Sequence, residues 1–553
     1  MSDTTGSGPM LAADGRPLKE SLRRALRRQK LRALALIAPL LLFVLLTFVI
    51  PIVSMLVRSV ENDIVSTTLP GTVPALAAWD SQTGEIPPEN VYQNMFFDMF
   101  NAAEAKEHTK LGTRLNYENT GLASLFRTSG RSMDDIGEVS QDAIEEVDAR
   151  FEEGAFWFEM INGTGGEALV AERRARWEDL TGDSMQGDLG FSPSQAFIDL
   201  LPITAAAYTD FAIWTVIDGE DVVAEEDPWE AVYAALAVDL NDPSRAAAIA
   251  SYRGPGADAL QALAAADLPQ QSFTDAFIEL DEDWGDVDVW QTIELYSSTY
   301  TPGYFLNSVD RELTINGIEA RPENEQIYIK LFMRTLWMSL IITSSCILLG
   351  YPVAWLLANF PVRTANVLMI LVLLPFWTSL LVRTSAWKVL LQQQGVINEI
   401  LVWLGFVDDA NRLILMNNST GTIIAMTHIL LPFMILPLYS VMKTIPPSYL
   451  RAAKSLGATN WTAFWRVYFP QSIPGIGAGS ILVFILAIGY YITPEIVGGT
   501  DGVFISNRIA YNISRSLNWG LAAALGTILL VLVMALYWLY DRIVGIDNVK
   551  LGG

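Results

Sequence analysis

A carboxylate and two aromatic rings lie close together near the end of an apolar stretch. Glu495 follows Tyr490 and Tyr491 by a few residues. A carboxylate pairs with ammonium groups, and the face of an aromatic ring attracts cations. These residues, with Trp377 in an earlier apolar stretch, are therefore candidate contacts for a cationic solute. The alternative is that Glu495 caps the next short element, and both interpretations stay open.

Other kinds of chemistry are excluded by what the sequence lacks. No Gly-x4-Gly-Lys-[Ser/Thr] pattern occurs, so the chain should not hydrolyse ATP by itself. His108 and His428 are its only histidines, too few for a histidine-based metal cluster or a catalytic triad to suggest itself. Cys346 is the single cysteine, which rules out an intrachain disulfide. We expect no catalytic residue, metal, cofactor or nucleic-acid partner.

The elements that must position these residues are long apolar segments. The chain has 553 residues, is 51% hydrophobic and has a mean hydropathy of +0.30. That is too apolar for a purely soluble protein of this length and suggests several membrane spans. The pattern predicts six, over residues 31–57, 329–358, 365–391, 421–442, 472–492 and 520–540.

The net charge of −25 is concentrated in one insertion between the first two spans. Residues 58–328 hold roughly fifty of the 61 acidic residues and about fourteen basic ones, a local charge near −37. This insertion also holds enough aromatic area to bury a core, in Trp157, Trp177, Trp214, Trp229, Trp284 and Trp290. We predict a folded, mainly helical domain. Its acidity could concentrate a polycation or simply keep the surface soluble.

Basic residues predict the orientation in the membrane. A run of arginine and lysine between residues 23 and 32 abuts the first span, which places the N-terminus in the cytoplasm. Lys443, Arg451, Lys454 and Arg466 lie in one later loop, residues 443–471. Both termini are therefore predicted to be cytoplasmic, with tails at 1–30 and 546–553, and the insertion lies on the opposite side.

That loop has a predicted shape of its own. Pro446 and Pro447 end the preceding span, and Ser448 can cap a new short helix. Gly457 permits a sharp turn, and a second short helix fits residues 461–469, ended by Pro470. The result would be a compact helix–turn–helix. An ordinary cytoplasmic loop with two interfacial helices is the alternative.

The order of residues in this loop resembles the EAA motif of ABC-importer permeases. That pattern is Glu-Ala-Ala, three residues, Gly, nine residues and Ile-x-Leu-Pro. Ala452, Ala453, Gly457 and Pro470 fall on it, whereas Arg451 stands where the family has Glu. The resemblance implies a coupling helix that docks into a groove on a cytoplasmic ATPase and carries its motion to the membrane.

Three further stretches look like permeases of the spermidine/putrescine type. They are residues 349–354, 374–387 and 491–499. Related opine, phosphonate and ferric-iron importers share parts of these patterns. The resemblance covers residues 30–57 and about 295–545 and leaves the acidic insertion without a counterpart.

The resemblance implies an all-α polytopic membrane fold. It comprises a first transmembrane helix at 31–57, an acidic extracytoplasmic domain at 58–328 and a five-helix permease core at 329–545. The implied function is that of the permease subunit of an ATP-driven ABC importer in the bacterial inner membrane, with a polyamine as the expected cargo. Implied partners are a cytoplasmic ABC ATPase dimer, a second and related permease chain, an extracytoplasmic solute-binding protein and membrane lipid. The alternatives are another solute, namely an opine, a phosphonate or ferric iron, and a membrane-anchored extracytoplasmic binding or sensor protein.

Overall fold

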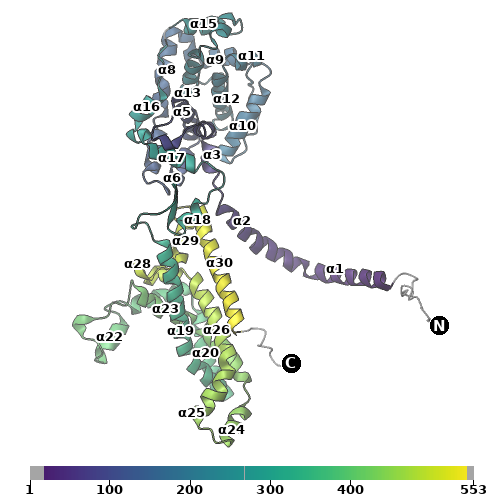
Figure 1. Cartoon of the computed structure of the whole chain (residues 1–553), viewed down its shortest axis with the longest axis vertical. Coiled ribbons are helices and arrows are strands. Elements are labelled where there is room, and N and C mark those ends of the chain that lie inside the picture. Colours follow the sequence, from purple (N-terminus) through teal and green to yellow (C-terminus); the bar gives the residue numbers. More distant parts are fainter. Residues whose placement is uncertain (1–17, 267, 545–553) are drawn as a thin grey trace, which may run out of the picture.

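The structure, a computed structural model, describes residues 18–266 and 268–544. The cytoplasmic tails predicted at 1–30 and 546–553 therefore lie partly and wholly outside the described residues. Figure 1 shows an elongated molecule with a helical inserted domain at one end and a bundle of long helices at the other. Within the described ranges the only sheet is a two-stranded ribbon, β1 (Arg311–Thr314) paired with β2 (Gly317–Ala320). The predicted all-α polytopic class with a large insertion is confirmed.

Five helices in the described residues are long and apolar enough to cross a membrane, and a bent pair would make six. The first joins α1 (Leu18–Val44), the π turn η1 (Leu45–Val49) and α2 (Ile50–Arg58). The others are α19 (Tyr328–Asn359), α23 (Ser419–Thr444), α26 (Phe469–Gly489) with its N-terminal extension, and α30 (Trp519–Val544).

The span predicted over residues 365–391 is bent in the structure. The structure has α20 (Val362–Leu373), a 3-10 turn η5 (Leu374–Trp377) and α21 (Leu380–Leu390), with a bend of 95°. Pro375 cannot donate to the helical ladder, and Thr378 and Ser379 are extended. The chain therefore breaks between two apolar halves that hydropathy alone joins.

Helices α19, α23 and α26 form the centre of the bundle. Their buried side chains make one apolar core, which includes Ile342, Cys346, Met426, Leu430, Met434, Leu438 and Val483. Small residues allow close approach: a Cβ on Gly479 would lie 2.6 Å from Met434 Sδ. The first span differs, because the side chains of residues 29–54 are exposed, and it contacts the bundle through α2, which packs on α30. Figure 1 shows α1 running away from the other helices.

The inserted domain, the residues between α2 and α19, consists of short helices. They are α3 (Ile64–Thr68), α4 (Thr72–Leu76), α5 (Glu89–Glu104), α6 (His108–Leu115), α7 (Leu122–Ser129), α8 (Met133–Val147), α9 (Gly154–Ile161), α10 (Glu167–Thr181), α11 (Gln195–Leu200), α12 (Pro202–Ile217), α13 (Glu230–Leu240), α14 (Ala246–Ser251), α15 (Ala257–Ala265), α16 (Phe273–Leu280), α17 (Val287–Leu295) and α18 (Gly303–Asn307).

Two aromatic cores hold this domain together. In one, the ring of Trp157 stacks on Tyr208, with 6.3 Å between ring centroids. In the other, the indole of Trp290 donates a hydrogen bond of 2.9 Å to the carbonyl of Trp284. Trp229 packs against both cores. The cores therefore meet along a seam inside the domain.

Candidate functional site

The predicted coupling loop lies at the end of the bundle farthest from the inserted domain (Figure 1). It comprises α24 (Pro447–Ser455), a turn, and α25 (Asn460–Ala463). Arg451, Ala452 and Gly457 are exposed, and Ala453 is half-buried. The structure thus brings four of the five predicted loop residues to one accessible tip.

Two details of this loop differ from the sequence prediction. Pro446 is the N-cap of α24, so Ser448 lies inside the helix rather than capping it. The side-chain cap belongs instead to α25, where the hydroxyl of Thr459 accepts from the backbone N–H of Thr462 at 3.2 Å. Pro447 occupies the first position of α24, which suits proline, because the missing N–H would have no partner there.

Gly457 makes the turn between the two short helices. Its φ is +89°, and an added Cβ would meet nothing within 4 Å. The requirement for glycine is therefore conformational, since only glycine adopts this region without a Cβ penalty. Its N–H bonds to the carbonyl of Lys454 at 3.0 Å and closes the end of α24.

Pro470 does not end a helix, which corrects the prediction of a separate helix over 461–469. From α25 the chain continues through a π turn, η7 (Phe464–Tyr468), directly into α26. The N–H of Phe469 bonds to the carbonyl of Phe464, five residues back. This wider turn lets the helix continue to Pro470. Pro470 has no N–H to donate, and near the start of α26 no such hydrogen bond is needed. The loop is consequently continuous with a membrane helix.

Exposed apolar side chains surround the predicted loop residues. Leu456 is 90% exposed and Trp461 72% exposed, with Tyr449 and Trp465 also exposed. Exposed apolar side chains gathered at one place are typical of a protein contact. We call these four residues, together with Arg451 and Lys454, the coupling surface. The aromatic spacing of Trp461 and Trp465 on one helix face was the available signal in the sequence.

Glu495 lies in α27 (Ile492–Val497), and its carboxylate accepts a hydrogen bond of 2.6 Å from Asn507 in α29 (Ile505–Ser514). It does not cap the next element, since α28 (Gly499–Gly502) begins without a side-chain cap. Asn507 also donates to the carbonyl of Tyr491 at 2.9 Å, and Ser506 donates to that of Tyr490 at 2.7 Å. One helix start therefore holds all three predicted residues, with Glu495 and Tyr491 exposed.

The fourth predicted pathway residue, Trp377, belongs to a different element. It lies in η5, at the bend, and is 72% exposed. Residues in α21 were not among the predicted contacts: the indole of Trp387 donates to His428 Nδ1 at 3.1 Å, joining α21 to α23. Thr384 and Thr493 hydroxyls, 3.1 Å apart, join α21 to α27. Polar residues inside apolar runs were the signal for this group.

Residues 347–544 match the family model described as binding-protein-dependent transport system inner membrane component. The spermidine/putrescine transport system permease protein PotB of Escherichia coli is 36% identical over 222 residues, which cover 40% of this chain and 80% of PotB. The inner membrane ABC transporter permease protein YdcU of the same organism is 34% identical over 263 residues, 45% of this chain and 82% of YdcU. The solved bacterial alginate ABC transporter has a TM-score of 0.34 and 18% identity, covering 41% of this chain and 81% of that chain.

Proposed function

We propose the function of this chain from one premise: it belongs to the binding-protein-dependent transport system inner membrane components, the permease subunits of ABC importers. Its cargo is a polyamine, putrescine or spermidine. The observation that carries this proposal is the 36% identity to permeases of spermidine/putrescine systems over 80% of their length. The exposed carboxylate of Glu495 beside Tyr491 supports it, because a polyamine offers ammonium groups to both.

The orientation follows from charge. The coupling surface carries Arg451 and Lys454, and basic loops remain on the cytoplasmic side. Both termini are then cytoplasmic, and residues 58–328 form an extracytoplasmic domain at the opposite end of the bundle. This places the coupling surface where a soluble ATPase operates and the inserted domain where a solute arrives.

Coupling to ATP hydrolysis runs through the coupling surface. A cytoplasmic ABC ATPase dimer receives α24 and the exposed Leu456 and Trp461 in a groove. Because α25 continues through η7 into α26, a displacement of the loop moves that membrane helix as one rod. Arg451 replaces the usual glutamate, so the ATPase should present a carboxylate at the contact.

Two other partners complete the importer. A related permease chain supplies the other half of the pore, and an extracytoplasmic solute-binding protein delivers the polyamine. Alternating exposure of the central cavity to the two sides then moves the solute. The membrane-anchored sensor predicted as an alternative is set aside, because the chain's likeness to permeases covers the bundle itself.

Uptake in cells tests the cargo. Labelled putrescine, spermidine, an opine and ferric iron are supplied to cells with and without this chain. Loss of polyamine uptake alone is the expected result. Unchanged uptake of polyamines with loss of another solute would reassign the cargo and leave the permease function in place. Co-purification of an ATPase with the tagged chain tests the coupling partner separately.

A further inference from the structure

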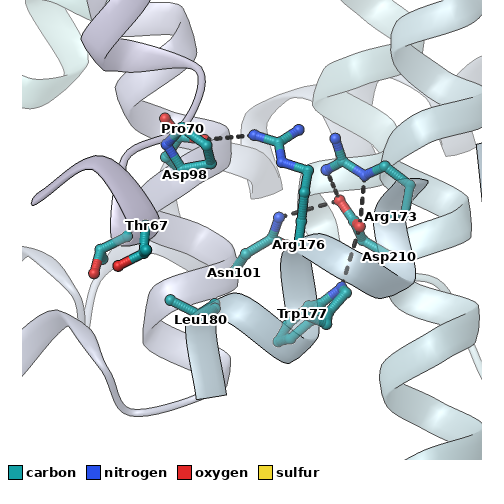
Figure 2. Close-up of a pocket in the computed structure, with 10 residues that line it drawn as sticks. Thr67, Pro70, Asp98, Asn101, Arg173, Arg176, Trp177, Leu180 and Asp210 are labelled. Carbon is teal, nitrogen blue, oxygen red and sulfur yellow. Dashed lines mark hydrogen bonds and ion pairs between the residues drawn. The ribbon is translucent and has the colours of Figure 1, made fainter. Parts of the chain in front are cut away.

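A cavity of about 250 Å³ lies in the inserted domain, outside the residues that match the family. Its wall is apolar on one part, where Phe97, Ile203 and Trp229 contribute. Trp229 packs against both cores, so the cavity lies at their seam. A pocket of about 20 Å³ shares its polar residues, which Figure 2 shows: Asp98, Asn101, Arg173, Arg176 and Asp210.

Both carboxylates in this wall have most of their acceptor sites occupied. Asp98 Oδ2 accepts from the backbone N–H groups of Gly71 at 2.8 Å and Thr72 at 2.7 Å and from the Thr72 hydroxyl at 2.8 Å. Its Oδ1 lies 3.4 Å from Arg176 Nη2. A carboxylate has about four lone-pair sites, so Oδ2 of Asp98 is fully used, while Oδ1 holds the one long contact to Arg176.

Asp210 is filled in the same way. Its Oδ1 accepts from Arg173 Nε at 2.7 Å and from the indole of Trp177 at 3.1 Å. Its Oδ2 accepts from Arg173 Nη2 and from Asn101 Nδ2, the latter at 3.1 Å. Asp210 is 2% exposed. A cation entering the cavity would therefore meet carboxylates that are already occupied.

The guanidinium groups of Arg173 and Arg176, in contrast, have unused hydrogen-bond donors. Each has five N–H donors. Arg176 makes one hydrogen bond among the described residues, the long one to Asp98, and its side chain is 31% exposed. Among the described residues, Arg173 donates only through Nε and Nη2, both to Asp210, and it is nine-tenths buried. The two arginines therefore offer more unused donors than the two aspartates offer unused acceptors.

The surroundings of Arg176 lower the pKa of its guanidinium group. Burial lowers its pKa, and the positive charge of Arg173 lowers it further, against the opposing effects of Asp98, Asp210 and Glu172. An added negative charge beside these two arginines would favour their charged forms. The arginine fork binds a carboxylate through two parallel hydrogen bonds.

We propose that this cavity binds a small molecule with one carboxylate and a short apolar body. The carboxylate contacts Arg176 and the spare donors of Arg173, and the body packs on Phe97, Ile203 and Trp229. The volume lies below the roughly 300–1,000 Å³ of sites for drug-sized ligands, which favours a short chain. The acidic exterior opposes an anion only weakly, because solvent-exposed charges are screened beyond about 8 Å at physiological salt.

This site is independent of the proposed cargo. A polyamine carries ammonium groups, for which the largely occupied carboxylates of Asp98 and Asp210 leave little acceptor capacity. The inserted domain therefore adds a ligand-binding function to the permease rather than a second site for a transported cation. Failure of polyamine uptake would not affect this proposal. Failure of an anion to bind the cavity would equally leave the proposed cargo unaffected.

Calorimetric titration of the full-length chain in nanodiscs tests it, with three probes: pentanoate, n-pentylamine and inorganic phosphate. Pentanoate and pentylamine share one apolar chain and differ in charge. Pentanoate is expected to bind at one site per chain, with pentylamine not binding and phosphate binding at least tenfold more weakly than pentanoate. Arg176→Gln is expected to weaken pentanoate binding at least tenfold, and Arg176→Lys less, because it retains the charge but not the fork.

The matched control is Arg174→Gln. Arg174 lies on the same helix, and its guanidinium donates to the carbonyl of Gly187 at 2.9 Å. It should leave pentanoate affinity unchanged. Equal binding of pentylamine, phosphate binding as tight as pentanoate, no binding of pentanoate, or full affinity in Arg176→Gln would each overturn the proposal. If Arg176→Gln lowers the unfolding temperature below that of the control, the test rests on Arg176→Lys. Full pentanoate affinity in Arg176→Lys would then overturn the proposal.

Discussion

The hydroxyl of Tyr117, in the inserted domain, donates a hydrogen bond of 2.5 Å to the backbone carbonyl of Ser516, just before the last membrane helix. The carbonyl of Tyr117 in turn accepts from Arg321 Nη2 at 3.0 Å. Arg321 precedes α19, so one tyrosine contacts the approaches to two membrane helices. This residue therefore connects the inserted domain to the bundle directly.

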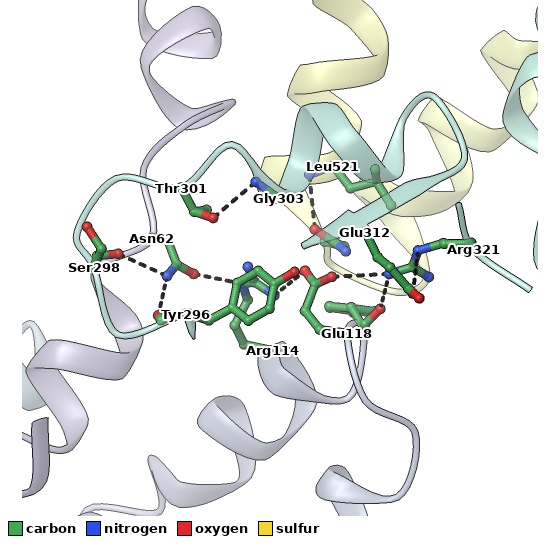
Figure 3. Close-up of polar contacts among 12 residues, drawn as sticks. Asn62, Arg114, Glu118, Tyr296, Ser298, Thr301, Gly303, Glu312, Arg321 and Leu521 are labelled. Carbon is green, nitrogen blue, oxygen red and sulfur yellow. Dashed lines mark hydrogen bonds and ion pairs between the residues drawn. The ribbon is translucent and has the colours of Figure 1, made fainter. Parts of the chain in front are cut away.

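A buried ion-pair chain surrounds that connection (Figure 3). Glu118 accepts from Arg321 at 3.1 Å and from Arg114 Nη1 at 2.8 Å. Arg114 Nε donates to Asn62, which follows α2, at 2.8 Å. The chain thus joins the segment that enters the domain to the segment that leaves it. We expect the domain and the ends of these helices to move together.

Glu118→Gln should destabilise the inserted domain. Its side chain is 5% exposed and pairs with two arginines. Removing one partner of a buried pair leaves the other charges uncompensated and costs about 3–5 kcal/mol. Chemical denaturation followed by tryptophan fluorescence measures the change. Glu107→Gln is the control, because Glu107 pairs with an exposed Lys110 and such pairs contribute about 0–1 kcal/mol. Equal effects of the two substitutions would contradict the buried network.

Tyr117→Phe should loosen the connection without unfolding the domain. It removes one hydrogen bond, worth about 0.5–1.5 kcal/mol, and leaves the ring in place. Hydrogen exchange should become faster at the amides near Ser516, with the two aromatic cores unchanged. Tyr252→Phe, whose ring is not at this junction, serves as the control. Unchanged exchange near Ser516 would mean that the bond does not restrain this segment.

Substitutions at Gly457 should separate backbone conformation from side-chain size. Valine is β-branched and strongly disfavoured at φ of +89°, so Gly457→Val should greatly reduce co-purification of the ATPase and polyamine uptake. Asparagine visits this region more readily, so Gly457→Asn should retain most of both. Open space around the position rules out a clash as the cause. Equal activity of glycine and valine would contradict a need for this turn.

Glu495→Gln should impair uptake of a cationic solute. Glutamine can still accept from Asn507, so the contact between α27 and α29 persists while the charge is lost. We expect the KM for putrescine to rise by about tenfold or more, as for the loss of a charge-assisted contact. Glu399→Gln, at an exposed acid that pairs with Arg412, is the control. A normal KM in Glu495→Gln would exclude this carboxylate from the pathway.

The inserted domain should lose stability in mild acid through His108. Burial lowers the pKa of this histidine, and the charge of Arg131 lowers it further; Nδ1 lies 3.3 Å from the carbonyl of Ala102. A lowered folded-state pKa means that the stabilisation is present above the unfolded pKa, about 6.5, and is lost as pH falls.

Denaturation at pH 5 to 7.5 measures this effect as the difference between the parent chain and His108→Gln. The difference should change by up to about 1.4 kcal/mol per pH unit below 6.5, because one proton is involved. A constant difference across this range would show that His108 does not charge on unfolding. Subtracting the variant cancels the carboxylates common to both chains.

What the sequence by itself determined was local. Membrane spans follow from hydropathy over about twenty consecutive residues, and the coupling loop follows from the spacing of Ala452, Ala453 and Gly457. For that reason the family, the membrane-spanning bundle and the inserted domain could be predicted from the sequence. Even there, the prediction that Pro470 ends a separate helix was wrong, because a π turn in the preceding residues lets α26 begin without interruption.

Only the tertiary structure decided the rest. Asp98 and Arg176 are 78 residues apart, and Tyr117 and Ser516 are 399 apart. No local pattern pairs such residues, since the partner of a buried charge is set by which helices pack together. The acidic composition of the insertion left two interpretations open, attraction of a polycation or a soluble surface. The largely occupied carboxylates and the unused arginine donors of its cavity are the basis for proposing an anion, because a site acts through the hydrogen-bonding capacity that folding leaves unused.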